Sequence, residues 1–171
     1  MNKTNFTILE DKKTLRMERT FPASQHKLWQ AYADPNKLAH WFAPKGWSTE
    51  VKAHSFSEGG EYVYVMKCED KSQGEWYGKT SAGKMAFSKI NPEISFMYTD
   101  YFTDDKGKVN EELPSSHTVV TLEPIGDDST KLVVDTYYET KEDLKTVLEM
   151  GMEDGYSQTL DKLEELLSKD S

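Results

Sequence analysis

The most regular pattern in the sequence is KEDLKTVLEMGMEDGYSQTLDKLEELLSKDS, residues 141–171. Its large apolar residues recur at steps of three, four or five, which places them on one face of an α-helix, with acids and lysines on the other. These residues are Leu144, Val147, Leu148, Met152, Tyr156, Leu160, Leu163 and Leu167. Thr140 is a suitable N-cap, and the acids Glu142 and Asp143 follow it in the first turn. The pattern predicts one long amphipathic helix of roughly 40 Å that lies across a whole sheet.

Two glycines, Gly151 and Gly155, interrupt this predicted helix. Each destabilises a helix interior by about 1 kcal/mol relative to alanine, so each requires an explanation. Three explanations stay open: another backbone approaches closely, a hollow lies beside the helix near Met150, Met152 and Tyr156, or the helix has an ordinary weak spot or kink.

The preceding sequence alternates in the manner of β-strands. Residues 1–13 read as a polar leader and residues 14–21 as a first strand. Ser24 and Asp34, the latter followed by Pro35, are N-caps for two short helices that end near Ala33 and Phe42. Further strands are expected at 47–56, 61–68, 85–90, 94–102, 117–123 and 131–138, with a short edge strand near 76–77. Short turns between consecutive strands indicate an antiparallel meander, so the fold class is α+β: a sheet of about six or seven strands curled around the long helix.

Alternation also predicts which side chains face that helix. The inward set is Tyr62, Tyr64, Met66, Phe96, Tyr98, Leu132 and Val134. Lys67, Lys131 and Asp135 have the opposite parity and are expected on the outer face, because a slip of one residue would bury their charges.

Composition limits the classes of function. The 171 residues fit a single domain, 1–171, with an ordered core at about 14–167. A net charge of -9 argues against nucleic acid and anionic membranes as partners, because phosphate binding needs clustered Lys and Arg. The single cysteine, Cys68, cannot form an intrachain disulfide, and the sequence contains no apolar run of membrane length. We therefore expect a cytoplasmic protein that is not inserted in a membrane.

A series of short motifs resembles one family. They are RTFPAS at 19–24, LWQAYADP at 28–35, WFAP at 41–44, EGGEY at 58–62, INPEI at 90–94 and GYSQTLDKL at 155–163. In order and spacing they resemble the heat-shock-protein ATPase activator homologue (AHA1-like) group of the START-like, SRPBCC (Bet v-type) superfamily. The resemblance implies a helix-grip fold with a cavity between the curved sheet and the long helix. Tyr156 stands where that family commonly has Trp.

Catalytic and metal-binding motifs are missing from the sequence. The four histidines have no metal-ligand spacing with one another, with Cys68 or with a carboxylate, so no metal and no cofactor is expected. Of the histidines, His40 is the one expected near a cavity. No paired acid and base can be recognised by spacing, and no nucleophile motif is present, so the chain is not expected to be an enzyme.

Aromatic and methionine residues come instead from almost every expected element. Such side chains build either a core or an adaptable apolar ligand pocket, and the resemblance favours the pocket. The candidate cavity residues are Trp41, Phe42, Tyr64, Met66, Met85, Phe87, Phe96, Tyr98, Met152 and Tyr156. We expect the hollow beside Gly155, bounded by Trp41, Phe87, Phe96, Met152 and Tyr156 and opening near residues 41–46.

Three functions stay open at this stage. The first is a carrier or sensor, of a stress-related kind, that binds a small apolar or aromatic molecule. The second is a chaperone-linked interaction module, which the family name alone suggests. The third is a cyclase- or hydrolase-like enzyme, which would need a buried Asp, Glu, His or Tyr dyad facing the cavity. Monomer and homodimer are equally open.

Overall fold

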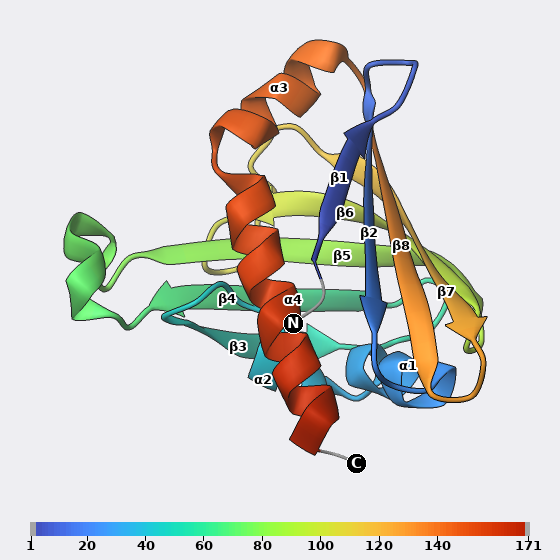
Figure 1. Cartoon of the computed structure of the whole chain (residues 1–171). Helices are drawn as coiled ribbons and strands as arrows, with labels where there is room; N and C mark the ends of the chain where they lie inside the picture. The colour runs from blue at the N-terminus through green and yellow to red at the C-terminus, as the bar shows by residue number, and fades with distance from the viewer. Residues whose placement is uncertain (1–2, 170–171) are drawn as a thin grey trace.

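The computed structural model describes residues 3–169 and contains one antiparallel sheet. The strands follow the order β1-β2-β8-β7-β6-β5-β4-β3, so the first two strands join the end of a continuous meander. In Figure 1 the sheet curls, and β2 and β8 run in a different direction from β3, β4 and β5. The strands are β1 (Asn5–Ile8), β2 (Thr14–Phe21), β3 (Trp47–His54), β4 (Glu61–Cys68), β5 (Thr80–Asn91), β6 (Ser95–Thr103), β7 (Ser116–Ile125) and β8 (Ser129–Tyr138).

The described sheet has eight strands, whereas six or seven were predicted. The difference is β1, which falls in the expected polar leader and pairs with β2 at the sheet edge. It has only four residues, Asn5–Ile8, and most of its side chains are exposed, so its polar–apolar alternation is too short to distinguish a strand from a polar leader. The edge strand predicted near residues 76–77 is wrong: the structure has a 3-10 segment, η1 (Lys71–Trp76), and β5 begins at Thr80.

Two short helices connect β2 to β3, and both predicted caps are confirmed. Ser24 accepts a hydrogen bond from the Lys27 N–H at the start of α1 (Gln25–Ala33). Asp34 accepts one from the Asn36 N–H at the start of α2 (Pro35–Trp41). These helices lie at one end of the sheet and close that end of the core (Figure 1).

The predicted single C-terminal helix is in fact two helices, α3 (Lys141–Glu149) and α4 (Met152–Lys169). Gly151 has φ +83°, a left-handed conformation that glycine adopts without a steric penalty. The Gly151 N–H donates to the Leu148 carbonyl oxygen, which closes the last turn of α3. Of the three explanations for this glycine, the kink is therefore the correct one. Figure 1 shows α3 turned away from the axis of α4, which lies across the sheet.

The predicted strand faces are confirmed. Tyr62, Phe96 and Leu132 are buried on the inner face with the rest of the inward set, although Met66 is partly buried. On the outer face, Lys131 pairs with Glu18 at 2.7 Å and Asp135 pairs with Arg16 at 2.8 Å, and Lys67 is exposed. This register places one side of each central strand against the helices.

Arg19 is an exception on the inner face, because it is charged and 3% exposed. Its guanidinium reaches α4, where it contacts Asp161 at 2.8 Å and Glu164 at 3.1 Å. Since a buried charge is tolerated only when it is paired, these contacts fix α4 against β2. They hold the C-terminal part of α4 in place.

Candidate functional site

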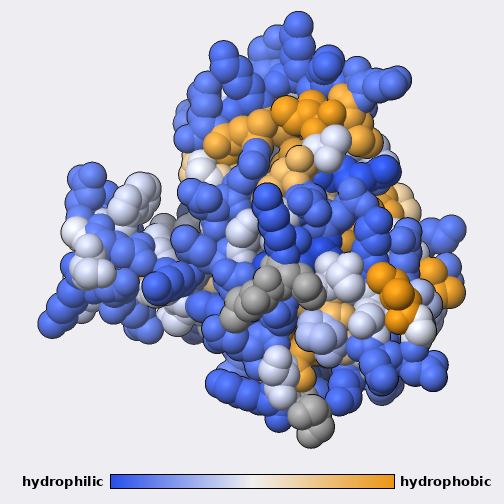
Figure 2. Space-filling model, viewed as in Figure 1, coloured by the Kyte–Doolittle hydropathy of each residue, from blue (hydrophilic) through white to orange (hydrophobic). Residues whose placement is uncertain are grey.

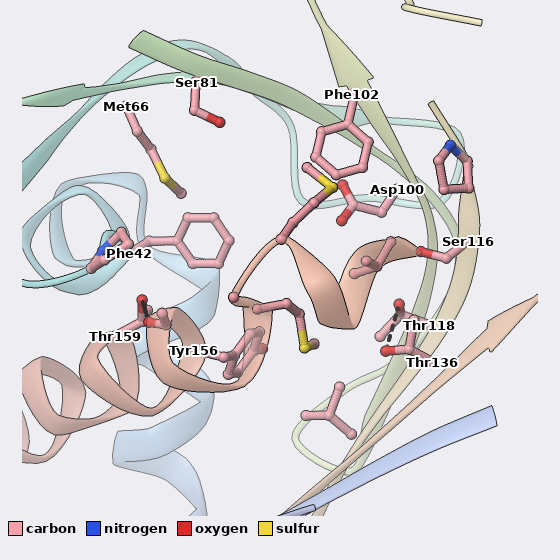
Figure 3. Close-up of a pocket in the computed structure, with 18 of the residues that line it drawn as sticks. Phe42, Met66, Ser81, Asp100, Phe102, Ser116, Thr118, Thr136, Tyr156 and Thr159 are labelled. Atoms are coloured by element: carbon pink, nitrogen blue, oxygen red, sulfur yellow. Dashed lines mark hydrogen bonds between the residues drawn. The ribbon is translucent and has the colours of Figure 1, made fainter. Parts of the chain in front are cut away.

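A pocket of about 320 Å³ lies between the inner face of the sheet and the α3–α4 junction. Its lining comes from the segment that follows α2, from strands β4 to β8 and from α3 and α4, and most of the lining surface is apolar. Figure 3 shows Phe42 and Tyr156 on one side of this space and Phe102, Asp100 and Ser116 on the other. The lining includes Phe42, Tyr64, Met66, Tyr98, Asp100, Phe102, Ser116, Thr118, Thr136, Tyr138, Met152, Gly155 and Tyr156.

The space exists because the C-terminal segment cannot fill it. Gly151 and Gly155 both line the pocket and contribute no side chain. A Cβ added at Gly155 would meet nothing closer than the Pro44 ring, at 3.8 Å, so no backbone packs against this glycine. Close approach of another backbone is therefore excluded at Gly155, which borders open space.

Apolar side chains also gather at the outer end of this region. Figure 2 shows them along α3. Met150, at the junction and in the pocket lining, is 54% exposed, and Leu148 and Met152 are partly buried beside it. Apolar side chains therefore extend from the protein surface at α3 to the pocket.

Six of the ten candidate cavity residues line this pocket: Phe42, Tyr64, Met66, Tyr98, Met152 and Tyr156. The other four do not line it. Three of them are buried in the packed core, namely Met85, Phe87 and Phe96. The rings of Phe87 and Phe96 pack edge-on against Phe56. Trp41 is fully buried, and its Nε1 donates to the Ala31 carbonyl oxygen at 2.9 Å. The pocket is consequently shifted from the expected position toward α3 and the ends of β6 and β7.

Asp100 is the residue that sequence reasoning missed. It lies on β6 with the parity of Tyr98 and Phe102, so its carboxyl faces the pocket (Figure 3). Its Oδ1 is covered by protein and has no hydrogen-bond partner. The carboxyl keeps some accessible surface because it lines the pocket, yet it lies deep in the molecule, and this burial raises the pKa of Asp100 to about 7. The sequence did contain a signal for this position: Asp100 has the same parity along β6 as Phe96 and Tyr98, which places its side chain on the inner face of the sheet.

Four tyrosines surround this carboxyl, each from a different element. Burial, together with the nearby Asp100 charge, raises the pKa of Tyr64, Tyr98 and Tyr138. Burial likewise raises the pKa of Tyr156 to about 12. These phenols therefore stay protonated at neutral pH and offer hydroxyl groups rather than charges.

The pocket lining contains no Lys, Arg or His among the residues that the structure describes. His40, expected near a cavity, is instead exposed, where its Nδ1 contacts the Asn36 carbonyl oxygen. His54 is the histidine at the core edge; burial lowers its pKa, and its ring packs against Tyr62 rather than the pocket. Within the described lining, Asp100 is thus the one residue whose charge changes near neutral pH.

Other kinds of site find no support within residues 3–169. No group of three His, Cys, Asp or Glu side chains comes together to hold a metal ion. Cys68 is buried, with its thiol 3.8 Å from the Asp70 carbonyl oxygen. No described helix is long and apolar enough to cross a membrane.

Comparison with known families gives one match, over residues 22–168, to the model described as Activator of Hsp90 ATPase homolog 1-like protein. The chain belongs to this family. Its α+β architecture, a curved antiparallel sheet with a C-terminal helical segment, is the helix-grip fold. No curated protein matches the sequence significantly.

Solved structures of similar proteins cover nearly the whole chain. The crystal structure of protein Ms6760 from Mycobacterium smegmatis is 28% identical, with a TM-score of 0.86 over 98% of this chain and 97% of that one. A solution structure of a protein from Arthrobacter aurescens is 25% identical, with a TM-score of 0.85 over 98% and 91%. The AHSA1 protein from Silicibacter pomeroyi, at 24% identity, shares the fold, with a TM-score of 0.70 over 92% and 99%. The family resemblance seen in the motifs is therefore confirmed.

Proposed function

We propose that this family member binds a small apolar or aromatic molecule in the pocket between the sheet and the α3–α4 junction, as a carrier or sensor. The single observation that carries the proposal is the pocket itself. Its volume, about 320 Å³, lies at the lower end of the range of roughly 300–1,000 Å³ found for ligand sites. A mainly apolar lining with a few polar groups is the usual composition of such a site.

The side chains of the lining support this proposal. Met66 and Met152 are flexible and polarisable, so they adapt to ligands of different shape. Phe42 and Phe102 offer ring faces for an aromatic ligand. The sheet side of the lining also contains two hydroxyl groups, those of Thr118 and Thr136, which lie 3.4 Å apart and add a polar group to the pocket.

The test is binding of a neutral aromatic probe, naphthalen-1-ylmethanol, measured by calorimetry. A leucine at Gly155 would project into the pocket, so the Gly155→Leu variant should bind the probe at least about tenfold more weakly. The matched control is Glu165→Leu, on the exposed face of the same helix, which should bind as the parent does. A parent protein without measurable affinity, or equal loss in both variants, would contradict the proposal.

Asp100 favours a second candidate, an enzyme that transfers a proton to or from a bound molecule. A carboxyl with a pKa of about 7 exchanges protons readily near neutral pH, and it lies close enough to Tyr64 for its charge to raise the pKa of that phenol. The lining contains no second carboxyl and no histidine in the described part of the chain, so the partner group would be a tyrosine. Mass spectrometry of a ligand that copurifies with the native protein separates the two functions. A carrier releases that ligand unchanged after incubation, whereas an enzyme converts it.

A further inference from the structure

We propose that the ligand of this pocket is a cation, an apolar molecule that carries one protonated nitrogen, and that this nitrogen pairs with the Asp100 carboxylate. The inference rests on the proposed function, because it names the chemical class of ligand for the same pocket.

Within residues 3–169 the Asp100 carboxyl has no charged partner, and a hydrogen bond from the Tyr101 backbone is its one stabilising contact. Asp100 Oδ1 is buried without a hydrogen-bond donor, and residues 3–169 provide no ion pair to Asp100. By contrast, Arg19, the buried charge of the core, has two carboxylate partners at about 3 Å. A carboxylate left without such a partner is unfavourable in an apolar space. A bound ammonium group would supply the missing donor and the missing charge.

Aromatic side chains line the same pocket as that carboxyl. Tyr98 and Phe102 flank Asp100 on β6, and Tyr64 and Tyr156 face the same pocket from β4 and α4. Figure 3 shows the Asp100 carboxylate beside the Phe102 ring and directed into the space bounded by Tyr156. Aromatic faces attract cations. A carboxylate beside them can accept a charge-assisted hydrogen bond from a protonated amine. The same rings accept the apolar body of the ligand.

The composition of the pocket lining disfavours an anionic ligand. An anionic ligand, such as a fatty acid, requires a Lys, Arg or His partner, and none lines the pocket in the described part of the chain. It would also approach a protein whose net charge is -9 and a pocket that contains a carboxylate. Both effects favour a cationic ligand over an anionic one.

Binding of such a cation depends on the charge of Asp100. Burial raises the pKa of Asp100 to about 7, so the carboxyl loses its proton between pH 6 and pH 8. The titratable groups that face it are Tyr64, Tyr98, Tyr138 and Tyr156, all of which stay neutral in this range. The lining residues that β7 and β5 contribute have no titratable side chain; they are Ser116, Thr118, Ser81 and Ala82. Amine affinity should therefore follow Asp100 alone.

Three probes with the same ring system test the inference by calorimetry: naphthalen-1-ylmethylamine, a cation; naphthalen-1-ylmethanol, which is neutral; and naphthalene-1-carboxylate, an anion. At pH 8 the parent protein should bind the amine at least about tenfold more tightly than the alcohol, and the carboxylate more weakly than both. From pH 6 to pH 8 the amine affinity should rise by about tenfold, as the ionised fraction of Asp100 rises, while the alcohol affinity should not rise.

Asp100→Asn removes the charge and keeps the shape. This variant should bind the alcohol as the parent does, which also shows that the pocket is intact, and should lose both the amine preference and its pH dependence. Asp127→Asn, in the exposed turn between β7 and β8, is the matched control and should keep both. If Asp100→Asn fails to fold, the pH series on the parent protein decides alone.

The outcomes separate this inference from the proposed function. Equal affinity of the parent for amine and alcohol, or an amine preference that persists in Asp100→Asn, overturns the cationic ligand and leaves the apolar pocket standing. Failure of the parent to bind any of the three probes overturns both.

Discussion

Asp100 stands where the alternation of β6 otherwise places aromatic side chains, so folding brings an ionisable group into an apolar space. The folded-state pKa of Asp100, about 7, lies above the value of about 3.9 for an unfolded chain. The folded protein therefore binds a proton more tightly than the unfolded one. The stabilising contribution of that proton is complete below about pH 4 and is lost as the pH rises through 7.

This linkage predicts a difference between the parent protein and Asp100→Asn. Between pH 5 and pH 8 the parent should lose up to about 3 kcal/mol of unfolding free energy relative to the variant, since one pKa unit corresponds to about 1.4 kcal/mol. Urea unfolding at both pH values measures it, and other ionisable groups cancel in the comparison. The same pH dependence in both proteins would show that Asp100 titrates normally.

The C-terminal segment shows what happens at the scale of an element. Gly151 and Gly155 are four residues apart in one apolar pattern, yet they differ in conformation: Gly151 has φ +83°, and Gly155 is within α4. Helical periodicity predicted both α3 and α4, because their buried residues follow one continuous apolar stripe in the sequence pattern. The break could not be read from that stripe, since a glycine of either kind leaves the same gap in the pattern.

The same substitution at these two glycines should therefore have opposite effects. Gly151→Ala forces a Cβ into the left-handed region and should destabilise the fold by about 1 kcal/mol or more. Gly155→Ala introduces a better helix former in open space and should stabilise by up to about 1 kcal/mol. The urea midpoints of the two variants, at unchanged slope, test this. Midpoints that move in the same direction would refute the assignment of one glycine as a cap and the other as a helical residue.

For the whole molecule, the sequence predicted the helix-grip arrangement and the strand faces, because burial of one sheet face imposes a strict alternation. It did not predict β1, whose contribution is backbone pairing at an edge. The sequence also did not distinguish the aromatic residues that line the pocket from those that only fill the core. Phe96 and Tyr98 share a strand, a face and the buried core, and only their position along that strand, relative to the α3–α4 junction, decides that Tyr98 also lines the pocket and Phe96 does not. Such a distinction depends on how far each helix extends over the curved sheet.

The two ends of the chain should contribute unequally to stability. A chain that stops at residue 139 lacks α3 and α4, exposes the inner face of the sheet and leaves Arg19 without Asp161 and Glu164. The lost buried residues are together worth on the order of 10 kcal/mol, which is comparable to the whole stability of a domain; they include Leu144, Val147, Leu160, Leu163 and Leu167. We expect no cooperative unfolding transition in urea for this truncated chain.

Removal of residues 1–9 is the control for this truncation. It deletes β1, an edge strand with mostly exposed side chains, and should leave a cooperative transition at a lower midpoint. If the chain without α3 and α4 still unfolds cooperatively, the sheet and the two short helices form a core of their own, and the C-terminal helices serve only to build the pocket.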